Sequence, residues 1–499
     1  MKLSEKKAGI ILSYITMIAN VAIKFLYIPL LIRQLGQSEY GLYSLVISIV
    51  GYLAILDFGF GSTVTRYTVK YKSDSNKDKL YKLYSTLSVI YLVIGFIALL
   101  VCLGINLASD MLFGNSMTDS EVSKLRMMIM LCGVNLLFSF PMQISSSILV
   151  AYERFKFKNG INLLKLLLEP CVVVALLFFV KTRSVGVIAV ITGFNLLGYL
   201  SYYIYAVKRL DFRINIKFVY PPMVKSLLTF SIWMFFLMLF EQLQFNMGQF
   251  VLGMTEGTAA VAVWGIVMIF VMNYRSLSTA ISNVFSPSIM SSVYDNSTGI
   301  FKSESIKMSR LQFLILSFIL MNFFIFGYDF IFIWAGKDYV DAYKPALIIM
   351  IPMMISMPLD FCYLYQMASN QLRFRVITLF CSFLLPFVII WSVGRITFNS
   401  FAWIISISIL IGQGLCVLYY LVRHMNFRVL PILIDQVKTI SIPFLVCVIF
   451  KVFYCSICCN FSDIAKLLLG IVCFNALLLP SYWFFSMNAY EKQLVLKKK

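Results

Sequence analysis

The chain has 499 residues, of which 61% are hydrophobic and only 13% are charged, whereas ordinary soluble domains carry about 25% charged residues. Its formal net charge is +20. The basic residues lie in short segments between apolar runs, so the charge favours anionic lipid headgroups as its partner rather than nucleic acid. Composition therefore excludes a soluble globular protein and argues against a nucleic-acid-binding one.

Apolar runs that can cross a bilayer follow one another along the whole chain. A transmembrane helix needs about 20 mostly apolar residues, and about fourteen runs meet this length. They begin near residues 10, 41, 85, 127, 161, 185, 227, 259, 311, 345, 374, 401, 437 and 464. The sequence therefore predicts an all-α, polytopic membrane protein with about fourteen transmembrane helices.

The connecting segments predict the orientation of the chain. Most of the 42 Lys and Arg residues fall in alternate segments, beginning with the N-terminal one. Because cytoplasmic loops carry the excess of basic residues in membrane proteins, we expect both termini in the cytoplasm. The first run is longer than a signal-peptide core and no small-x-small site follows it, so we expect it to be retained.

An internal repeat divides the chain. Residues 35–39 and residues 252–256 both read Leu-Gly-x-x-Glu, and each motif follows the first run of a set of six. Two parallel six-helix lobes with a central cavity between them suit alternating access. We predict an N-lobe at 1–207, a cytoplasmic linker at 208–225, a C-lobe at 226–425, and two additional helices with a basic tail at 426–499.

Several of the apolar runs contain ionisable residues. Such a side chain costs about 2.5–3.5 kcal/mol at the centre of a bilayer, so a whole set of them indicates a hydrated cavity enclosed by helices. The set comprises Lys24, Asp57, Lys165, Glu169, Glu241 and Arg275.

Polar stripes at helical spacing extend this interpretation. Asn20 and Tyr27 share a helical face with Lys24, while Gln242, Asn246 and Gln249 belong to a strongly polar stretch of the seventh run. Lys24 and Arg275 would offer cations to an anionic group, and the amides would bind sugar hydroxyls. We predict that these residues line the lumen and bind substrate.

Three of the acidic residues also have purely structural interpretations. Lys165 and Glu169 are spaced i, i+4 and would neutralise each other. Asp57 would alternatively pair with Arg66, and Asp360 would cap a broken helix.

Glu241 is either a proton carrier or a counter-charge to Arg275. With Asp57 and Asp360 it completes the set of candidate coupling or charge-partner residues. Cys455, Cys458 and Cys459 cluster near a loop, but no second ligand group accompanies them. We expect neither a metal nor a cofactor.

Short motifs in the first 70 residues resemble a known family. They are residues 28–36 (Ile-Pro-Leu-Leu-Ile-Arg-Gln-Leu-Gly), 39–43 (Glu-Tyr-Gly-Leu-Tyr) and 56–61 (Leu-Asp-Phe-Gly-Phe-Gly), with Phe-Ser-Pro at 285–287. This pattern resembles the Wzx-type O-antigen flippases, which belong to the superfamily of multidrug, oligosaccharidyl-lipid and polysaccharide exporters.

The resemblance implies a non-enzymatic transporter in the bacterial cytoplasmic membrane. Its implied substrate is an oligosaccharide linked through pyrophosphate to undecaprenol, moved from the inner to the outer leaflet, with a polysaccharide polymerase as a further partner. Related proteins line the cavity with Arg, so Lys24 is a departure because Lys lacks the bidentate fork.

Three alternatives stay open. A cation-coupled multidrug exporter would have a mainly acidic lumen. The two additional helices resemble those of peptidoglycan-precursor flippases. A membrane glycosyltransferase or polymerase would need a large outer loop with paired carboxylates, which the segment at 107–124 does not offer.

Overall fold

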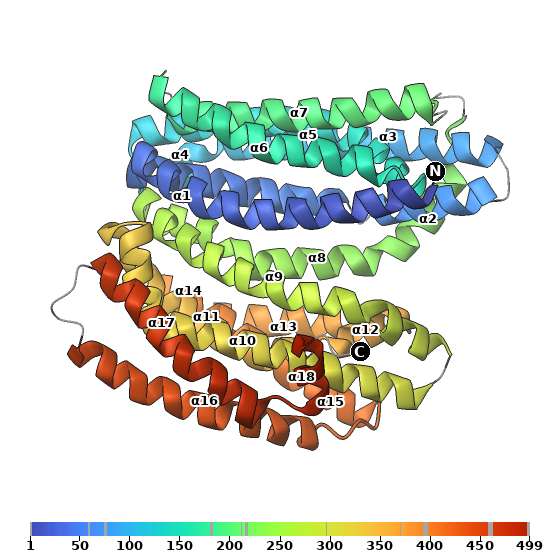
Figure 1. The fold of residues 1–499 in the computed structure, drawn as a ribbon. Coiled ribbons are helices and arrows are strands. Elements are labelled where there is room, and N and C mark those ends of the chain that lie inside the picture. Colours follow the sequence, from blue (N-terminus) through green and yellow to red (C-terminus); the bar gives the residue numbers. More distant parts are fainter. Residues whose placement is uncertain are drawn as a thin grey trace. The chain divides into compact units, whose positions relative to one another are not determined.

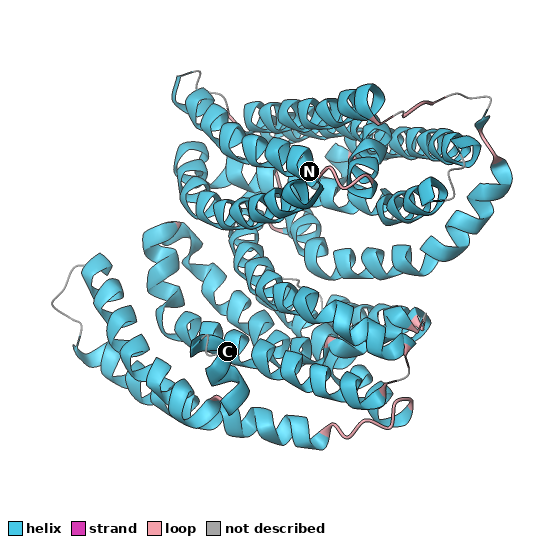
Figure 2. Ribbon diagram, turned by 45° about the vertical axis from the view of Figure 1, so that its right-hand side comes forward, coloured by secondary structure: helices cyan, strands magenta, loops and turns pink. Residues whose placement is uncertain are grey.

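The computed structural model describes residues 2–57, 60–73, 77–179, 183–210, 212–214, 218–295, 297–369, 371–392, 398–457 and 463–496. Some side chains within these helices, including those of Lys24 and Arg66, lie outside the described part. Within the described ranges the secondary structure is helical, without strands (Figure 2). Helices suit a bilayer because a helix forms its backbone hydrogen bonds internally, where no water is available.

The chain forms two compact units, residues Met1–Ala262 and Val263–Lys499. Figure 1 labels their helices along the chain. The first unit contains α1 (Lys2–Ala54), α2 (Phe60–Ser73), α3 (Lys77–Leu107), α4 (Ser109–Phe113), α5 (Asp119–Ala151), α6 (Phe155–Phe179), α7 (Ser184–Arg209) and α8 (Pro221–Thr255), and α9 (Thr258–Tyr294) begins in it.

The second unit holds the rest of α9 and the helices that follow it. They are α10 (Thr298–Trp334), α11 (Tyr343–Ser356), α12 (Phe361–Ala368), α13 (Leu372–Ser392), α14 (Phe398–Ser408), α15 (Cys416–Arg423), α16 (Leu430–Ile457), α17 (Asp463–Ser481) and α18 (Ala489–Leu496). A π-helical segment, Ile409–Leu415, joins α14 to α15. The boundary between the units follows Ala262, so α8 belongs to the first unit. The division into lobes with a linker at 208–225 stays a prediction.

Eleven segments of the described chain are long and apolar enough to span a membrane. The other expected runs, from residues 10, 227 and 374, fall on α1, α8 and α13, in which many side chains lie outside the described part. α1 itself contains a break at Gly36, whose φ of 77° and ψ of 173° are not helical. The first two predicted runs therefore correspond to the two parts of α1, and the prediction of a polytopic all-α membrane protein is confirmed.

Glycine residues allow helices of the first unit to approach one another closely. A Cβ atom at Gly95 of α3 would lie 3.0 Å from the carbonyl oxygen of Leu137 on α5, and one at Gly133 of α5 would lie 2.9 Å from Cβ of Cys102 on α3. The same holds for α1 and the start of α9, where a Cβ at Gly41 would lie 2.0 Å from the carbonyl oxygen of Thr258. Such contacts are the usual basis of helix association in membranes, where lipid removes the hydrophobic drive.

Aromatic rings fill the core between α10 and the last two long helices. Phe326 of α10 lies 5.2 Å from Tyr454 of α16 and 5.8 Å from Phe474 of α17, measured between ring centroids. Asn322 and Asn475 exchange side-chain hydrogen bonds across the same contact. The two helices expected as an addition to the C-lobe are thus packed against α10 within the second unit.

Candidate functional site

The polar residues predicted on the seventh run lie on α8 and face α1. Gln249 is buried and donates a hydrogen bond from Nε2 to Oγ of Ser44, at 3.1 Å. A Cβ atom at Gly51 would lie 2.6 Å from Nε2 of Gln242 and 3.9 Å from Nδ2 of Asn246. The three amides therefore run along the second part of α1, and Gln242 and Gln249 make contacts between helices there.

The residues predicted on the first run lie on the N-terminal part of α1. Asn20 and Tyr27 are both half-buried. The side chain of Lys24 lies outside the described residues, so its role in substrate binding stays a prediction.

Asp57 lies just after α1, at the turn into α2. Its Oδ1 accepts a hydrogen bond of 2.6 Å from the hydroxyl of Tyr91 on α3. Tyr91 is fully buried between the rings of Phe60 and Phe140, at centroid distances of 6.0 and 6.4 Å. This tyrosine fixes the carboxylate, while the expected pairing with Arg66 involves a side chain outside the described part.

The pairing of Lys165 with Glu169 is confirmed. The Lys165 ammonium lies 3.8 Å from Oε2 of Glu169, one turn further along α6. It also donates a hydrogen bond to Oδ1 of Asn195 on α7. These two charges therefore neutralise each other and tie α6 to α7.

Asp360 does not cap the helix that follows it, contrary to the structural interpretation. It precedes α12, but its side chain makes no capping hydrogen bond. Instead its Oδ1 lies 3.9 Å from NH2 of Arg375, a buried residue of α13. The guanidinium of Arg375 also lies over the ring of Tyr363, 4.6 Å from its centroid. The attraction of a buried cation on the neighbouring helix has replaced the local cap.

Arg275 and Glu241 fall in different units. Arg275 is half-buried in the part of α9 that belongs to the second unit, and its carbonyl oxygen accepts a hydrogen bond from Thr279. Glu241 is half-buried on α8 in the first unit. Both residues make interactions within the protein, and their mutual pairing stays a prediction. The cluster Cys455, Cys458 and Cys459 lies outside the described side chains.

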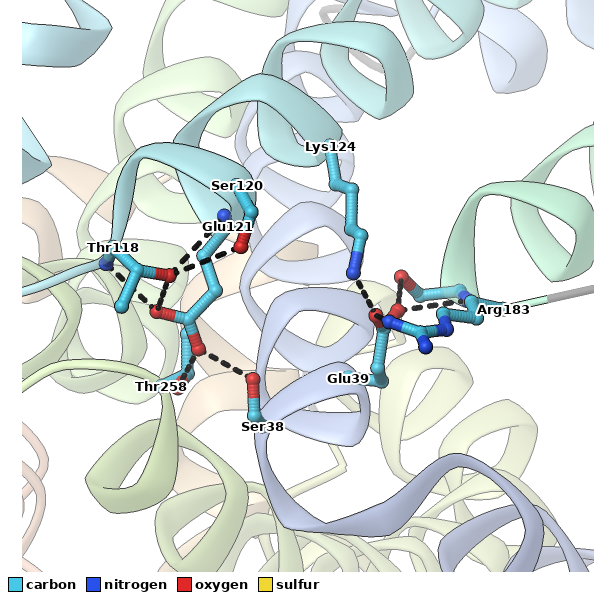
Figure 3. Close-up of polar contacts among 9 residues, drawn as sticks. Ser38, Glu39, Thr118, Ser120, Glu121, Lys124, Arg183 and Thr258 are labelled. Atoms are coloured by element: carbon cyan, nitrogen blue, oxygen red, sulfur yellow. Dashed lines mark hydrogen bonds and ion pairs between the residues drawn. The ribbon is translucent and has the colours of Figure 1, made fainter.

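Glu39 is a densely bonded carboxylate of the first unit that was not among the predicted site residues. Its Oε1 accepts a hydrogen bond from Lys124 of α5 and lies 3.7 Å from NH1 of Arg183. Its Oε2 accepts hydrogen bonds from the hydroxyl and, at 3.1 Å, from the backbone N–H of Ser184, the first residue of α7 (Figure 3). The signals in the sequence were its place as the last residue of the Leu-Gly-x-x-Glu repeat and as the first residue of the motif at 39–43.

Glu121 forms a second group beside it (Figure 3). Thr118 and Glu121 form a capping box at the start of α5. Oε1 of Glu121 also accepts a hydrogen bond of 2.8 Å from the hydroxyl of Thr258, and another from Ser38. Glu39 and Glu121 together connect α1, α5, α7 and the beginning of α9 at the end that the topology prediction places outside the cell.

Replacing Glu39 by glutamine should destabilise the protein. The amide keeps the shape but loses the charge that faces Lys124 and Arg183. Its NH2 group would face either the donors of Ser184 or those two cations, so one set of donors loses its acceptor. Buried polar groups left unpaired cost about 1–3 kcal/mol, so the midpoint of thermal unfolding in detergent should fall. Glu256→Gln is the matched control, since it changes the equivalent residue of the repeat, which is exposed. Equal midpoints for both variants would show that the cluster around Glu39 does not stabilise the fold.

The sequence profile of the family described as "Polysaccharide biosynthesis protein" matches residues 6–294, more than half of the chain. The chain belongs to this polysaccharide biosynthesis family. No curated protein sequence gives a match.

Solved structures of a lipid II flippase and of MATE transporters share the fold of this chain. The lipid II flippase MurJ in an inward closed conformation gives a TM-score of 0.71 at 15% identity, covering 95% of this chain and 99% of the flippase. An inward-facing MATE family multidrug resistance transporter gives 0.61 at 12% identity, covering 82% and 97%. The Vibrio cholerae MATE transporter VcmN, as a mutant, gives 0.60 at 12% identity, covering 85% and 97%. At these identities the likeness concerns the fold.

Proposed function

We propose that this protein is a flippase that moves undecaprenyl-pyrophosphate-linked oligosaccharide from the inner to the outer leaflet of the bacterial cytoplasmic membrane. The observation that carries the proposal is the match of residues 6–294 to a polysaccharide biosynthesis family on a fold shared with a lipid II flippase. Saccharide units of this pathway are joined to a lipid, so their transport requires a protein that passes a polar headgroup through the membrane interior.

The proposed mechanism is alternating access, with the headgroup in a polar cavity and the lipid tail in the bilayer. Lys24 and Arg275 would hold the pyrophosphate, because ionised groups form the stronger hydrogen bonds with phosphate oxygens. Asn20, Tyr27 and Asn246 would bind sugar hydroxyls. Gln242 and Gln249 would contribute from the contact of α8 with α1.

The membrane potential favours export of such a substrate. Moving one negative charge outward across an inside-negative potential of 100 mV releases about 2.3 kcal/mol. Transport of the loaded carrier therefore needs no ion gradient, and the candidate coupling residues Glu241, Asp57 and Asp360 would act in the return of the empty carrier. We expect both termini in the cytoplasm and a polysaccharide polymerase as a pathway partner that receives the product.

Deletion of the gene tests the proposal. Surface polysaccharide should disappear, and lipid-linked units should accumulate on the inner leaflet, because the step between synthesis and polymerisation is lost. A plasmid-borne copy should restore surface display. Normal surface polysaccharide with altered drug tolerance would instead identify a multidrug exporter.

A peptidoglycan-precursor flippase is the second candidate, favoured by one observation. The likeness to the lipid II flippase extends over 95% of the chain and so includes α16 or α17, whereas the two MATE structures cover 82% and 85%. Under this alternative the deletion would block cell-wall synthesis and leave the other surface polysaccharide intact.

A further inference from the structure

A pocket of about 610 Å³ lies wholly within the second unit. Its walls come from the end of α9, the first turns of α10, the end of α12 and the loop between α15 and α16. All of these segments belong to the end of the unit that the Lys/Arg asymmetry predicts to be cytoplasmic. None of the residues assigned above to substrate binding or coupling lines it.

Aromatic rings form the inner wall of the pocket. The ring of Phe301 lies 5.5 Å from that of Tyr365 and 6.2 Å from that of Phe427, with both pairs in edge-to-face geometry. Phe301 and Phe427 are buried members of the hydrophobic core. The pocket therefore has an apolar base made of packed aromatic rings.

The pocket is lined by basic side chains and by no acidic ones. Lys302, His424 and Arg428 line it, and no Asp or Glu is among the lining residues. Within the part of the chain that the structure describes, neither Lys302 nor Arg428 takes part in an ion pair. Two cations that face a common pocket repel each other unless an anion is present, so the arrangement favours a negatively charged ligand.

The loop that carries two of these side chains has a defined shape. Asn426 adopts a left-handed conformation with φ of 49°, and the N–H of Phe427 donates to the carbonyl oxygen of Leu421 at 2.9 Å. The ring of His424 stacks on that of Tyr420 at a centroid distance of 4.9 Å. The turn therefore brings His424 and Arg428 to the same pocket.

The first turn of α10 adds hydrogen-bond donors. Thr298, the first residue of this 37-residue helix, lines the pocket. Ser297 stands at the capping position but makes no capping hydrogen bond, and its hydroxyl donates instead to the carbonyl oxygen of Ser292 at 3.3 Å. The first N–H groups of a helix have no partner within it, and they favour anions.

We propose that this pocket binds a phosphate group, carried by an anionic phospholipid headgroup or by a soluble phosphate. The guanidinium of Arg428 and the ammonium of Lys302 supply charge-assisted hydrogen bonds, the start of α10 supplies backbone donors, and the aromatic base accepts the apolar part of an ester. Basic pockets on the cytoplasmic side of membrane helices are a known mode of headgroup recognition. The proposal is independent of the transported substrate.

Binding to the purified full-length protein tests the proposal. The lipid probe is phosphatidylglycerol, counted as bound adducts by native mass spectrometry, with a galactosyl diacylglycerol as the phosphate-free control lipid. The soluble probe is inorganic pyrophosphate, measured by titration calorimetry. At least one probe should bind saturably to the wild type, and Lys302→Gln/Arg428→Gln should weaken that binding about tenfold or more, since two charge-assisted contacts are lost.

A matched control removes the same charge outside the pocket. Arg423→Gln/Lys438→Gln changes two exposed residues that do not line it, and its binding should equal that of the wild type. The exchange Lys302→Arg/Arg428→Lys should keep most of the affinity. If the double Gln variant loses binding of phosphatidylglycerol alone, the ligand is a lipid headgroup. If it loses binding of pyrophosphate, the ligand is a soluble phosphate. The proposal would be overturned if the double Gln variant bound the probes like the wild type, or if the control variant lost as much binding. Neither result would change the deletion phenotype that tests the flippase function.

Discussion

Replacing Arg275 by alanine is expected to abolish surface display of the polysaccharide without lowering the amount of protein in the membrane. A hydrogen bond to a charged group contributes about 1.5–3 kcal/mol, and in the proposed role the guanidinium fork would engage two phosphate oxygens at once. Lys24→Ala should have the same effect, whereas Lys24→Arg should be tolerated because it keeps the charge and adds a fork. Surface polysaccharide measured against protein level gives the readout.

Arg126→Ala is the matched control for this experiment. Arg126 pairs with Asp110 at the protein surface, where an ion pair contributes only about 0–1 kcal/mol, so display should be unchanged. Wild-type display from a well-expressed Arg275→Ala variant would remove Arg275 from the site. It would favour the alternative in which this residue is a counter-charge to Glu241.

Replacing Arg310 by methionine should cause the largest loss of stability in the second unit. Nε of Arg310 donates to Oε1 of Glu491 at 2.7 Å and NH2 donates to Oε2 at 3.2 Å, while NH1 binds Asp435. The Glu491 side chain is 2% exposed, so without the guanidinium its charge is buried next to an apolar side chain. Removing one partner of a buried pair costs about 3–5 kcal/mol, which should appear as a large fall in the unfolding midpoint in detergent.

Two further variants separate the ion pair from the loss of packing. Lys307→Met removes a cation one turn earlier on α10, which pairs with Glu304 in a partly exposed position, and should cost less than about 1 kcal/mol. Arg310→Met/Glu491→Gln should regain part of the stability because the uncompensated carboxylate is gone. If the single Arg310 variant unfolds at the wild-type midpoint, this pair does not hold α18 to α10.

The helices were predictable because the signals for them are local. Apolar runs fix where helices lie, and Gly36 in the first motif marks the break within α1. The pairing of Lys165 with Glu169 was predictable for the same reason, since residues four apart on a helix are neighbours. The failure at Asp360 shows the limit of this reasoning, because its partner Arg375 lies on the next helix rather than in the adjoining turn.

The long-range polar contacts could not be derived from spacing. Glu39 meets Ser184, 145 residues away, and Arg310 meets Glu491, 181 residues away. The repeat marks Glu39 but does not indicate its partner, and nothing in the local pattern distinguishes Arg310 or Glu491 from other charged residues near the ends of apolar runs. The contact of Gln242 with Gly51 was hidden in the same way, because a stripe of amides on one helix does not reveal whether it faces water or another helix.

Transfer of the substrate across a membrane by the purified protein is the most direct test of the proposed flippase activity. Proteoliposomes that contain undecaprenyl-pyrophosphate-linked oligosaccharide are exposed to a membrane-impermeant glycosidase, and the fraction of oligosaccharide cleaved over time reports movement between leaflets. The wild-type protein should raise the cleaved fraction well above that of protein-free vesicles, and Arg275→Ala should not. Equal cleavage with and without the wild-type protein would contradict the proposal. Uptake of a cationic drug by the same protein-containing vesicles would then identify a multidrug exporter.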